Sequence, residues 1–356
     1  MKVVASISYV KLRQIGIGQG MNSEVFVAED PQFNAEIVVK EIEKSKFLGL
    51  GLSNYFIEAQ AMFKSHHENI VRGHYACETP NLICLAMPYY RRGSLTDRIA
   101  RRSLALSELI RVGQGLLSGV SQVHLSDFVH FDIKPSNVLF DDLDVPMLAD
   151  FGQARAVSSG VVAALPPIYQ LVRPPELIPS GAVGIPQGDI FQVGLLLYRA
   201  VNGEPNYETQ IPPAGPTFRA DLEKRILTGK FPDRDRFLPH VPKHLRTVIR
   251  KALQVDPSKR YATAIDFADA LSTVTIVLDW SVEWLATDRM RWTASRPGQP
   301  LLIVDLLDDG ANWKIEIHTQ SAGAKPRARA TSDWAGGLTR ADAFTRLRTL
   351  FGKLAA

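Results

Sequence analysis

The sequence contains little cysteine and no long apolar run. Its 356 residues include only Cys77 and Cys84, which have neither metal-type spacing nor histidine partners, so we expect free thiols in a reducing compartment. The longest apolar run, VGLLLYRAV at 193–201, is about half as long as a bilayer requires and contains Arg199. The first residues, MKVVASISYV, lack the apolar core and cleavage site of a signal peptide. These absences predict a cytoplasmic protein without a membrane segment.

A large excess of charge of either sign is also lacking. Lys and Arg number 41 and Asp and Glu number 37, which gives a formal net charge of +4. Because this excess is small for the chain length, it does not indicate a nucleic-acid partner. Hydrophobic residues make up 46% and charged residues 22% of the chain, as is usual for a globular protein that buries a substantial core in two or three structural units.

Hydrophobic patterning predicts a sheet-rich part followed by a larger helical part. Residues 9–42 contain runs of β-branched and aromatic residues in near-alternation, which indicate strands. A helix is expected over residues 53–66, with Ser53 as its N-cap. From about residue 94 the periodicity becomes helical, and one of these helices is expected to close at Gly203.

Composition separates two loops and a last module from these parts. Pro and Gly crowd residues 160–188 and 203–216, which predicts long functional loops. After about residue 275 a hairpin is expected over 300–319, around Asp309-Gly310, and an amphipathic helix over 338–354. The basic run SAGAKPRARA between them is interpreted as a solvated loop rather than as a nucleic-acid patch. Four tryptophans are expected to build the core of this module or to dock it on the rest of the chain: Trp280, Trp284, Trp292 and Trp334.

A glycine-rich segment between two predicted strands is the first candidate for nucleotide binding. Its glycines would let the backbone approach phosphate closely, and the β-branched residue after them could pack on a base. A hairpin turn without a ligand would have a similar composition. The candidate residues are Ile17, Gly18, Gly20, Ser23 and Val25.

Lys40 and Glu58 form the second candidate. Lys40 ends the apolar strand IVVK and can reach a phosphate if a carboxylate fixes it, and Glu58 lies on the following predicted helix. A solvated Lys and an ordinary helix Glu are the alternative, since both residue types are common at protein surfaces.

The segment HFDIKPSNVLF, residues 130–140, carries the strongest signal for phosphoryl transfer. Asp132 can orient an attacking hydroxyl, Lys134 can neutralise charge on the transferred group, and the amide oxygen of Asn137 can bind a hard cation. Asp150 of DFG follows thirteen residues after Asn137 and offers a second ligand for Mg²⁺. A polar turn capped by Asp would not explain both motifs at this separation.

Taken in order, these motifs resemble those of a eukaryotic-type (Hanks-type) protein kinase catalytic domain over residues 9–274. The matching segments are GQGMNSEV, VVK, FIEAQAMFKSHHENIV, HFDIKPSN, DFG, RPPE, GDIFQVG and DPSKRYAT. The resemblance implies a bilobal α+β fold, with a β-rich N-lobe over about 9–87 and a helical C-lobe over about 91–274, followed by a small α+β module. It implies a bacterial enzyme that uses ATP and Mg²⁺ and phosphorylates Ser or Thr hydroxyls of a protein.

The resemblance also implies roles for individual residues. Lys40 would pair with Glu58, Asp132 would be the catalytic base or would orient the acceptor, and Asn137 and Asp150 would hold the metal. Structural roles would fall to Asp189 below the catalytic loop and to Glu176 and Arg260 as a clamp.

The same resemblance places the adenine site and the substrate class. The segment LAMPYYRRGSL resembles the hinge between the lobes, and the backbone of Tyr90 would face the adenine. Lys134, two residues after the catalytic Asp, resembles Ser/Thr-directed kinases rather than tyrosine kinases. The hinge residues would be Met87, Pro88 and Tyr90.

Two positions depart from the family pattern. Phe131 stands where many kinases have an Arg that binds a phosphate on the activation loop, which predicts a non-RD kinase whose activity does not depend on loop phosphorylation. Tyr169 stands where the family usually has a Thr that bonds the catalytic Asp and Lys. Ser158, Ser159 and Tyr169 are the hydroxyl residues of the loop 153–173, and their autophosphorylation stays open.

Two other interpretations compete with a protein kinase. A small-molecule phosphotransferase of the aminoglycoside-kinase type would share the catalytic Asp, the Asn and the metal Asp, but that group usually lacks the Lys of DIKP and the clamp from PPE to Arg. A pseudokinase scaffold usually loses at least one catalytic residue, and here all are intact. Whichever of these three interpretations holds, the last module, residues 275–356, could recruit a substrate or bind a partner protein.

Overall fold

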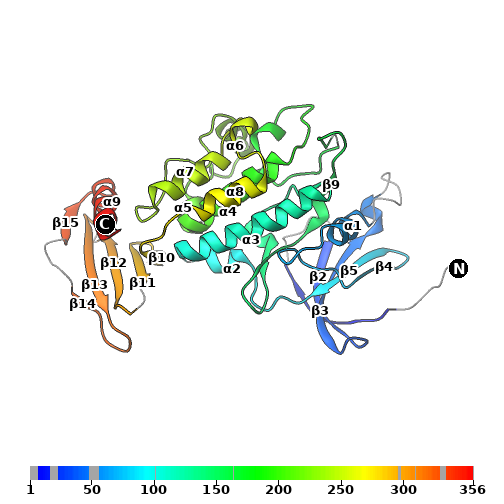
Figure 1. The fold of residues 1–356 in the computed structure, drawn as a ribbon, viewed down its shortest axis with the longest axis horizontal. Helices are drawn as coiled ribbons and strands as arrows, with labels where there is room; N and C mark the ends of the chain where they lie inside the picture. The colour runs from blue at the N-terminus through cyan, green and yellow to red at the C-terminus, as the bar shows by residue number, and fades with distance from the viewer. Residues whose placement is uncertain are drawn as a thin grey trace.

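The computed structural model describes residues 7–16, 23–47, 56–100, 102–162, 164–295, 298–308, 310–328 and 334–355. They form a sheet-rich N-lobe, a larger helical C-lobe and a C-terminal module, which follow one another along the long axis of the molecule (Figure 1). This is the predicted bilobal α+β architecture with an added module. Among these residues, no helix combines the length and the apolar character needed to cross a bilayer.

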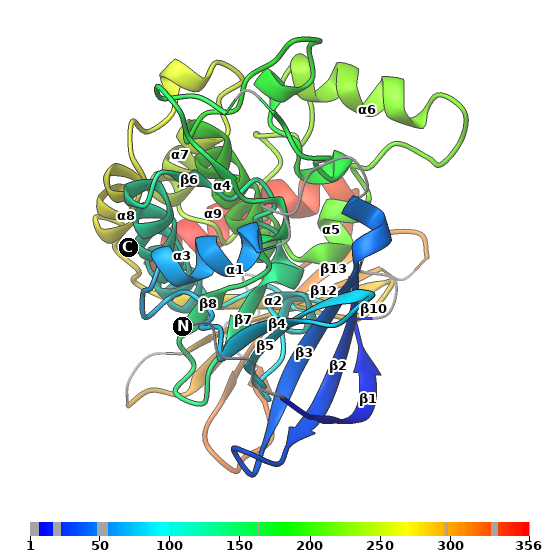
Figure 2. The same ribbon diagram turned by 90° about the vertical axis from the view of Figure 1, so that its right-hand side faces the viewer.

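The N-lobe is an antiparallel sheet with the strand order β1-β2-β3-β5-β4, seen in front in Figure 2. The central strand β3 is buried from Ile37 to Ile42. Ile37 and Val39 pack in a small apolar cluster on one face, and Lys40 on the other face binds Glu58 and Asp150. The strands are β1 (Val10–Ile15), β2 (Ser23–Asp30), β3 (Ala35–Glu43), β4 (Tyr75–Glu78) and β5 (Leu82–Pro88).

Helix α1 (Ile57–Lys64) packs beside this sheet and lies within the predicted helix over 53–66, of which Phe56, Ser65 and His66 are not helical. It begins after Phe56, which provides no side-chain cap, and Ser53 lies outside the described residues. It ends at Lys64 because the backbone of Ser65 has already left the helical conformation (φ −92°, ψ 34°). A short 3₁₀ turn, η1 (Lys44–Phe47), follows β3.

The C-lobe is organised around α3 (Leu106–Leu125) and α4 (Gln187–Asn202). Almost every residue of α4 is buried, which explains why its sequence is mainly apolar. Gly203 ends α4 with φ 72°, as predicted. The other helices are α2 (Leu95–Ile99), α5 (Glu204–Glu208), α6 (Phe218–Leu227), α7 (Lys243–Ala252) and α8 (Ala264–Ser272).

Short elements surround the loops of the C-lobe. Residues 203–216 were expected to be a loop, but they contain α5, which Pro205 can start because its missing N–H is not needed in a first helical turn. The short strands are β6 (Phe128–Val129), β7 (Val138–Phe140), β8 (Pro146–Leu148) and β9 (Arg155–Ala156). The 3₁₀ turns are η3 (Pro135–Asn137), η4 (Phe151–Gln153), η5 (Gln170–Val172), η6 (Pro175–Leu177) and η7 (Pro257–Lys259).

The C-terminal module is an antiparallel sheet with the order β10-β11-β12-β13-β14, in which β15 also pairs with β13. The hairpin of β12 and β13 and the last helix, α9, lie where the sequence predicted them. The elements are β10 (Asp279–Ala286), β11 (Arg289–Ser295), β12 (Leu301–Asp308), β13 (Trp313–Gln320), β14 (Arg327–Ala328), β15 (Ala335–Leu338) and α9 (Arg340–Ala355).

The module is docked on the C-lobe through hydrogen bonds and a shared core. Ser103 N donates to Val282 O (2.7 Å), and Val282 N donates to Ser103 Oγ (3.0 Å), so the edge of β10 is covered by the C-lobe. The ring of Trp284 covers Gly203, where an added Cβ would lie 2.3 Å from it. Buried side chains of both parts, among them Trp280 and Trp292, belong to one continuous hydrophobic core.

His240 lies in this shared core as a buried histidine. Trp292 Nε1 donates a hydrogen bond to His240 Nδ1 (3.0 Å), and burial lowers the pKa of His240 from 6.5 to about 3. Below pH 6.5 the unfolded chain therefore binds a proton that the native protein does not bind until about pH 3. Stability is expected to fall with falling pH over this range, by at most about 1.4 kcal/mol per pH unit.

A His240→Asn variant tests this pH dependence. Asn offers an acceptor oxygen for Trp292 but cannot be protonated, so its free energy of unfolding should change less between pH 6.5 and 4.5 than that of the wild type. Urea denaturation at each pH measures this. His244→Asn replaces an exposed histidine of α7 and should follow the wild type. Parallel pH curves for the wild type and His240→Asn would contradict the assignment.

Candidate active site

Three charged side chains from distant parts of the chain meet below the N-lobe sheet. Lys40 of β3 donates from Nζ to both carboxylate oxygens of Glu58 on α1 (2.8 and 2.9 Å). It also donates to Asp150 Oδ1 (2.7 Å), from 110 positions along the chain. The predicted pair of Lys40 and Glu58 is therefore formed. Because both side chains are buried, the alternative of a solvated Lys and an ordinary surface Glu is excluded.

The ion network sets the charge states of its members. Burial opposes a charged Lys40, but the carboxylates of Asp150 and Glu58 outweigh it and raise the pKa of Lys40. Burial also opposes a charged Asp150, but Lys40 lowers the pKa of that carboxyl to about 2. The pKa of Glu58 is raised, because its burial exceeds the effect of Lys40. Lys40 and Asp150 are therefore both charged at neutral pH.

The predicted catalytic residues of the loop 130–140 also meet. Asp132 Oδ2 accepts hydrogen bonds from Lys134 Nζ (2.8 Å) and from Asn137 Nδ2 (2.9 Å). Asn137 Nδ2 donates in addition to the carbonyl of Asp132 (2.8 Å). This fixes the amide of Asn137, so that its oxygen points away from Asp132.

Two buried side chains of α4 hold the catalytic loop from below. The predicted cap Asp189 accepts from the backbone N–H groups of His130 (2.8 Å) and Phe131 (2.9 Å). Gln192 accepts from the N–H of Ile133 (2.9 Å) and donates to the carbonyl of Phe131 (2.8 Å). Sequence reasoning missed Gln192, although an amide among the apolar residues of a helix, directly before the run 193–201, was a usable signal.

Further contacts brace the site. Arg260 binds Glu176 with two hydrogen bonds (2.8 and 2.6 Å), which is the predicted clamp. The ring of His130 contacts Phe151 of η4 edge to face, with centroids 4.7 Å apart. Asp150, just before η4, has the left-handed φ of 62°.

The predicted nucleotide-binding residues are placed only in part. Ile17, Gly18 and Gly20 lie outside the described residues. Ser23 and Val25 belong to β2. Val25 pairs with Lys40 across the strands, and paired residues of an antiparallel sheet share a face, so Val25 lies on the Lys40 face.

The predicted hinge follows the same face of the sheet. Met87 and Pro88 end β5, and Met87 pairs with Val38, two residues before Lys40. Tyr90 is half-buried and packs against the main core. Its carbonyl accepts a hydrogen bond from Gly93 N (3.2 Å) in a turn. One lone pair of this carbonyl is thus used within the chain and one remains for a ligand.

The side chains predicted to bind the metal suit Mg²⁺. Within the described ranges, no cluster of three or more His, Cys, Asp or Glu residues could hold a metal by itself. Mg²⁺ does not need one, because it takes one or two protein oxygens together with phosphate oxygens and water. Asn137 offers an amide oxygen, and Asp150 offers Oδ2, which accepts no hydrogen bond from the described part of the chain.

Phe131 is part of an apolar cluster under the activation segment, residues 153–173. It is fully buried against Val162 and Leu177. Val162 and Gly184 exchange two backbone hydrogen bonds of 2.8 Å above it, and a Cβ on Gly184 would lie 2.3 Å from the Phe131 ring. The position that carries Arg in many kinases therefore anchors the segment through apolar packing.

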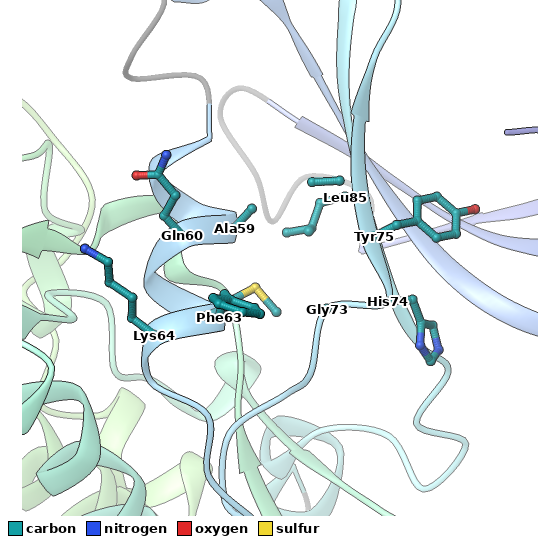
Figure 3. Close-up of a pocket in the computed structure, with 10 residues that line it drawn as sticks. Ala59, Gln60, Phe63, Lys64, Gly73, His74, Tyr75 and Leu85 are labelled. Carbon is teal, nitrogen blue, oxygen red and sulfur yellow. The ribbon is translucent and has the colours of Figure 1, made fainter. Parts of the chain in front are cut away.

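An open, mainly apolar pocket lies on another side of α1, between this helix and β4 (Figure 3). Phe63 and Tyr75 are among the side chains that line it, and Phe63 is 86% exposed. None of its lining residues was predicted as a site residue. Because Lys40, Glu58 and Asp150 are not among the residues that line it, the pocket is separate from their ion network.

Comparisons with known proteins point to one family. The family model for the protein kinase domain matches residues 9–272. The chain is 29% identical over 273 residues to serine/threonine-protein kinase PrkC of Bacillus subtilis, covering 74% of this chain and 40% of that protein. It is 27% identical over 249 residues to CBL-interacting serine/threonine-protein kinase 21 of Arabidopsis thaliana, covering 70% and 57%. It is 27% identical over 266 residues to serine/threonine-protein kinase pkn2 of Myxococcus xanthus, covering 72% and 31%. The match spans less than two thirds of the length of each of these relatives.

Proposed function

Because the chain belongs to the protein kinase family, we propose that it transfers the γ-phosphoryl group of ATP to Ser or Thr hydroxyls of a protein substrate. The observation that carries the proposal is the convergence of Asp132, Lys134 and Asn137 in one hydrogen-bonded group, with the ion network of Lys40 nearby in the fold. The serine/threonine kinases among its relatives support the class of acceptor.

The proposed mechanism assigns one role to the acceptor side of the site, formed by Asp132 and Lys134, and another to the nucleotide side, formed by Lys40 and Glu58. The acceptor hydroxyl approaches Asp132, which orients it and receives its proton as the new O–P bond forms and the bond to the leaving ADP oxygen breaks. Lys134, beside Asp132, stabilises charge on the transferred group. Lys40, fixed by Glu58, binds phosphate oxygens of the nucleotide.

Asn137 and Asp150 are proposed to hold Mg²⁺. When bound, this cation neutralises phosphate charge and stabilises the charge that develops during transfer. The charged state of Asp150 at neutral pH, maintained by Lys40, favours cation binding. The Gly-rich segment with Ile17, Gly18 and Gly20, together with Ser23, Val25 and the hinge residues Met87, Pro88 and Tyr90, is proposed to bind the rest of ATP.

Incubation with γ-labelled ATP, Mg²⁺ and a cell extract tests the proposal. Label on Ser and Thr of proteins, absent with an Asp132→Asn variant, is the expected result. Label on a small molecule instead would indicate the phosphotransferase alternative, and no label at all would indicate a pseudokinase. Neither alternative is favoured, because the catalytic residues meet and Arg260 binds Glu176 as in the predicted clamp.

Activity is proposed not to depend on phosphorylation of the activation segment. Phe131 supports this, because its apolar contacts with Val162 and Leu177 take the place of a phosphate contact. A Ser158/Ser159→Ala double variant removes the exposed serines of the segment and should keep activity within about threefold of the wild type, at an unchanged melting temperature. Less than a tenth of wild-type activity in a folded variant would contradict the proposal.

A partner protein is proposed to bind the outward face of the module sheet. The opposite face of the sheet is buried by α9 and the C-lobe. On β11 the buried residues of that face alternate with Arg291 and Thr293, which lie on the outward face and are half-exposed. Arg291 also covers the buried carboxylate of Asp305, with which it forms an ion pair (2.7 Å). A Thr293→Arg variant should lose co-purifying partners without a change in melting temperature. Unchanged co-purification would exclude this face.

A further inference from the structure

A buried amide on α4 links two separate segments on the acceptor side of the site. Gln192 is fully buried. Its Oε1 accepts from Ile133 N (2.9 Å), and its Nε2 donates to Phe131 O (2.8 Å) and to Val172 O (3.1 Å). Phe131 and Ile133 flank Asp132, whereas Val172 is the last residue of η5. One side chain thus fixes η5 relative to the catalytic loop.

This turn brings Tyr169 to the edge of the site. Tyr169 is the residue before η5, and its carbonyl accepts from Val172 N (3.1 Å). Val172 is buried, whereas Tyr169 is 52% exposed. The inner side of the turn is therefore fixed while the phenol ring lies at the surface, with Lys134 Nζ 5.6 Å from its centre.

Lys134 is consequently held from two directions. Its Nζ donates to Asp132 Oδ2 (2.8 Å), and the Tyr169 ring lies within the range of a cation–π contact. A lysine side chain has many rotamers, and these two contacts select the ones that keep the ammonium beside Asp132. Phosphoryl transfer depends on such positioning, so a displaced Lys134 would impair transfer even with nucleotide bound.

We propose that Gln192 and Tyr169 are positioning residues for phosphoryl transfer to protein, in which Gln192 holds η5 against the catalytic loop and Tyr169 confines the Lys134 ammonium beside Asp132. The inference rests on the proposed kinase function. Both contacts involve uncharged side chains, as does the packing of Phe131, so the acceptor side is assembled without a phosphate group. The nucleotide side is held separately, by Lys40 with its two carboxylates.

Tyr169→Leu and Tyr169→Phe form the main test, because this side chain is half exposed and its replacement should not unfold the protein. Leu removes the ring face that Lys134 contacts, whereas Phe keeps it. The assays are steady-state transfer to dephosphorylated casein, ATP hydrolysis without casein, and the Kd of MgADP. For Tyr169→Leu we expect kcat/KM for casein and the rate of ATP hydrolysis both to fall about tenfold or more, because both transfers depend on Lys134, with the Kd of MgADP within about twofold of the wild type. Tyr169→Phe should match the wild type in all three.

Gln192→Met and Gln187→Met test the amide. Met is similar in size to Gln but forms none of the three hydrogen bonds, so Gln192→Met should reproduce the Tyr169→Leu pattern together with a lower melting temperature. Gln187 lies on the same helix and donates to Ala262 O (3.1 Å), away from the catalytic loop. Its Met variant should lose stability without a selective loss of transfer to casein and of hydrolysis.

The outcomes separate this inference from the proposed function. Casein labelling by Tyr169→Leu equal to that of the wild type overturns the inference alone. An equal loss of transfer, hydrolysis and MgADP affinity in this variant also overturns it, because that pattern indicates general damage to the site. A wild type that hydrolyses ATP but labels no protein overturns the proposed function and the inference with it.

Discussion

Replacing Asp132 by Asn is expected to lower the rate of phosphoryl transfer by about 10²–10⁴-fold, the usual contribution of a positioned general base. The amide cannot receive the acceptor proton, and it removes the negative charge to which Lys134 Nζ and Asn137 Nδ2 donate. Transfer of label from ATP to protein measures the effect. The Kd of MgADP should stay close to that of the wild type, because Lys40 and its partners are unchanged.

An Asp142→Asn variant is the matched control. It makes the same chemical change at an exposed position shortly after the catalytic loop, and we expect wild-type transfer from it. Asp132→Asn with more than about a tenth of wild-type activity would show that this carboxylate is not the base. The same loss in both variants would indicate an effect of net charge instead.

Deleting residues 275–356 is expected to destabilise the kinase domain severely, with a fall in melting temperature of about 10 °C or more or with aggregation. The C-lobe would lose the hydrogen bonds between Ser103 and Val282 and the cover of Trp284 over Gly203. It would also expose the apolar residues that it shares with the module. Each buried contact of this kind contributes roughly 1–3 kcal/mol. Thermal unfolding followed by circular dichroism and size-exclusion chromatography measure the outcome.

A pair of glycine variants tests the docking without a deletion. Gly203→Ala combines a positive φ of 72° with a Cβ only 2.3 Å from Trp284, so we expect a loss of roughly 2–4 kcal/mol in the free energy of unfolding. Gly181→Ala has a similar φ of 76° but open space around its Cβ, and should cost about 1 kcal/mol. Equal losses in the free energy of unfolding of the two variants, or a chain 1–274 as stable as the full chain, would show that docking of the module does not stabilise the C-lobe.

Much of the fold could be predicted because it is determined by short stretches of chain. The alternation of β3, the helical periodicity of α3 and α4 and the closure of α4 at Gly203 each depend on neighbouring residues. Where the sequence prediction was wrong, at the C-terminal end of α1 and in the region that contains α5, the local signals were weak. Helix α1 ends with Ser65 rather than a glycine at its C-cap, and a single Pro defines the start of α5.

The candidate site was predictable for the same reason where its residues are close in sequence. Asp132, Lys134 and Asn137 lie within six positions, so the geometry of one loop brings them together. The meeting of Lys40 with Asp150 spans 110 positions, and only the order of the family motifs indicated it. Nothing local could show that Gln192 reaches both the catalytic loop and η5, since these contacts depend on three separate segments.

The sequence by itself therefore determined most of the elements, the family and the chemistry of the catalytic loop, because periodicity and motif spacing are encoded within a few residues. Only the tertiary structure decided that Phe131 anchors the activation segment by packing and that the module shares its core with the C-lobe. A buried tryptophan has the same sequence signature whether it packs within its own module or against a neighbour. Which apolar surfaces meet depends on the complementarity of whole faces, and no single segment contains that information.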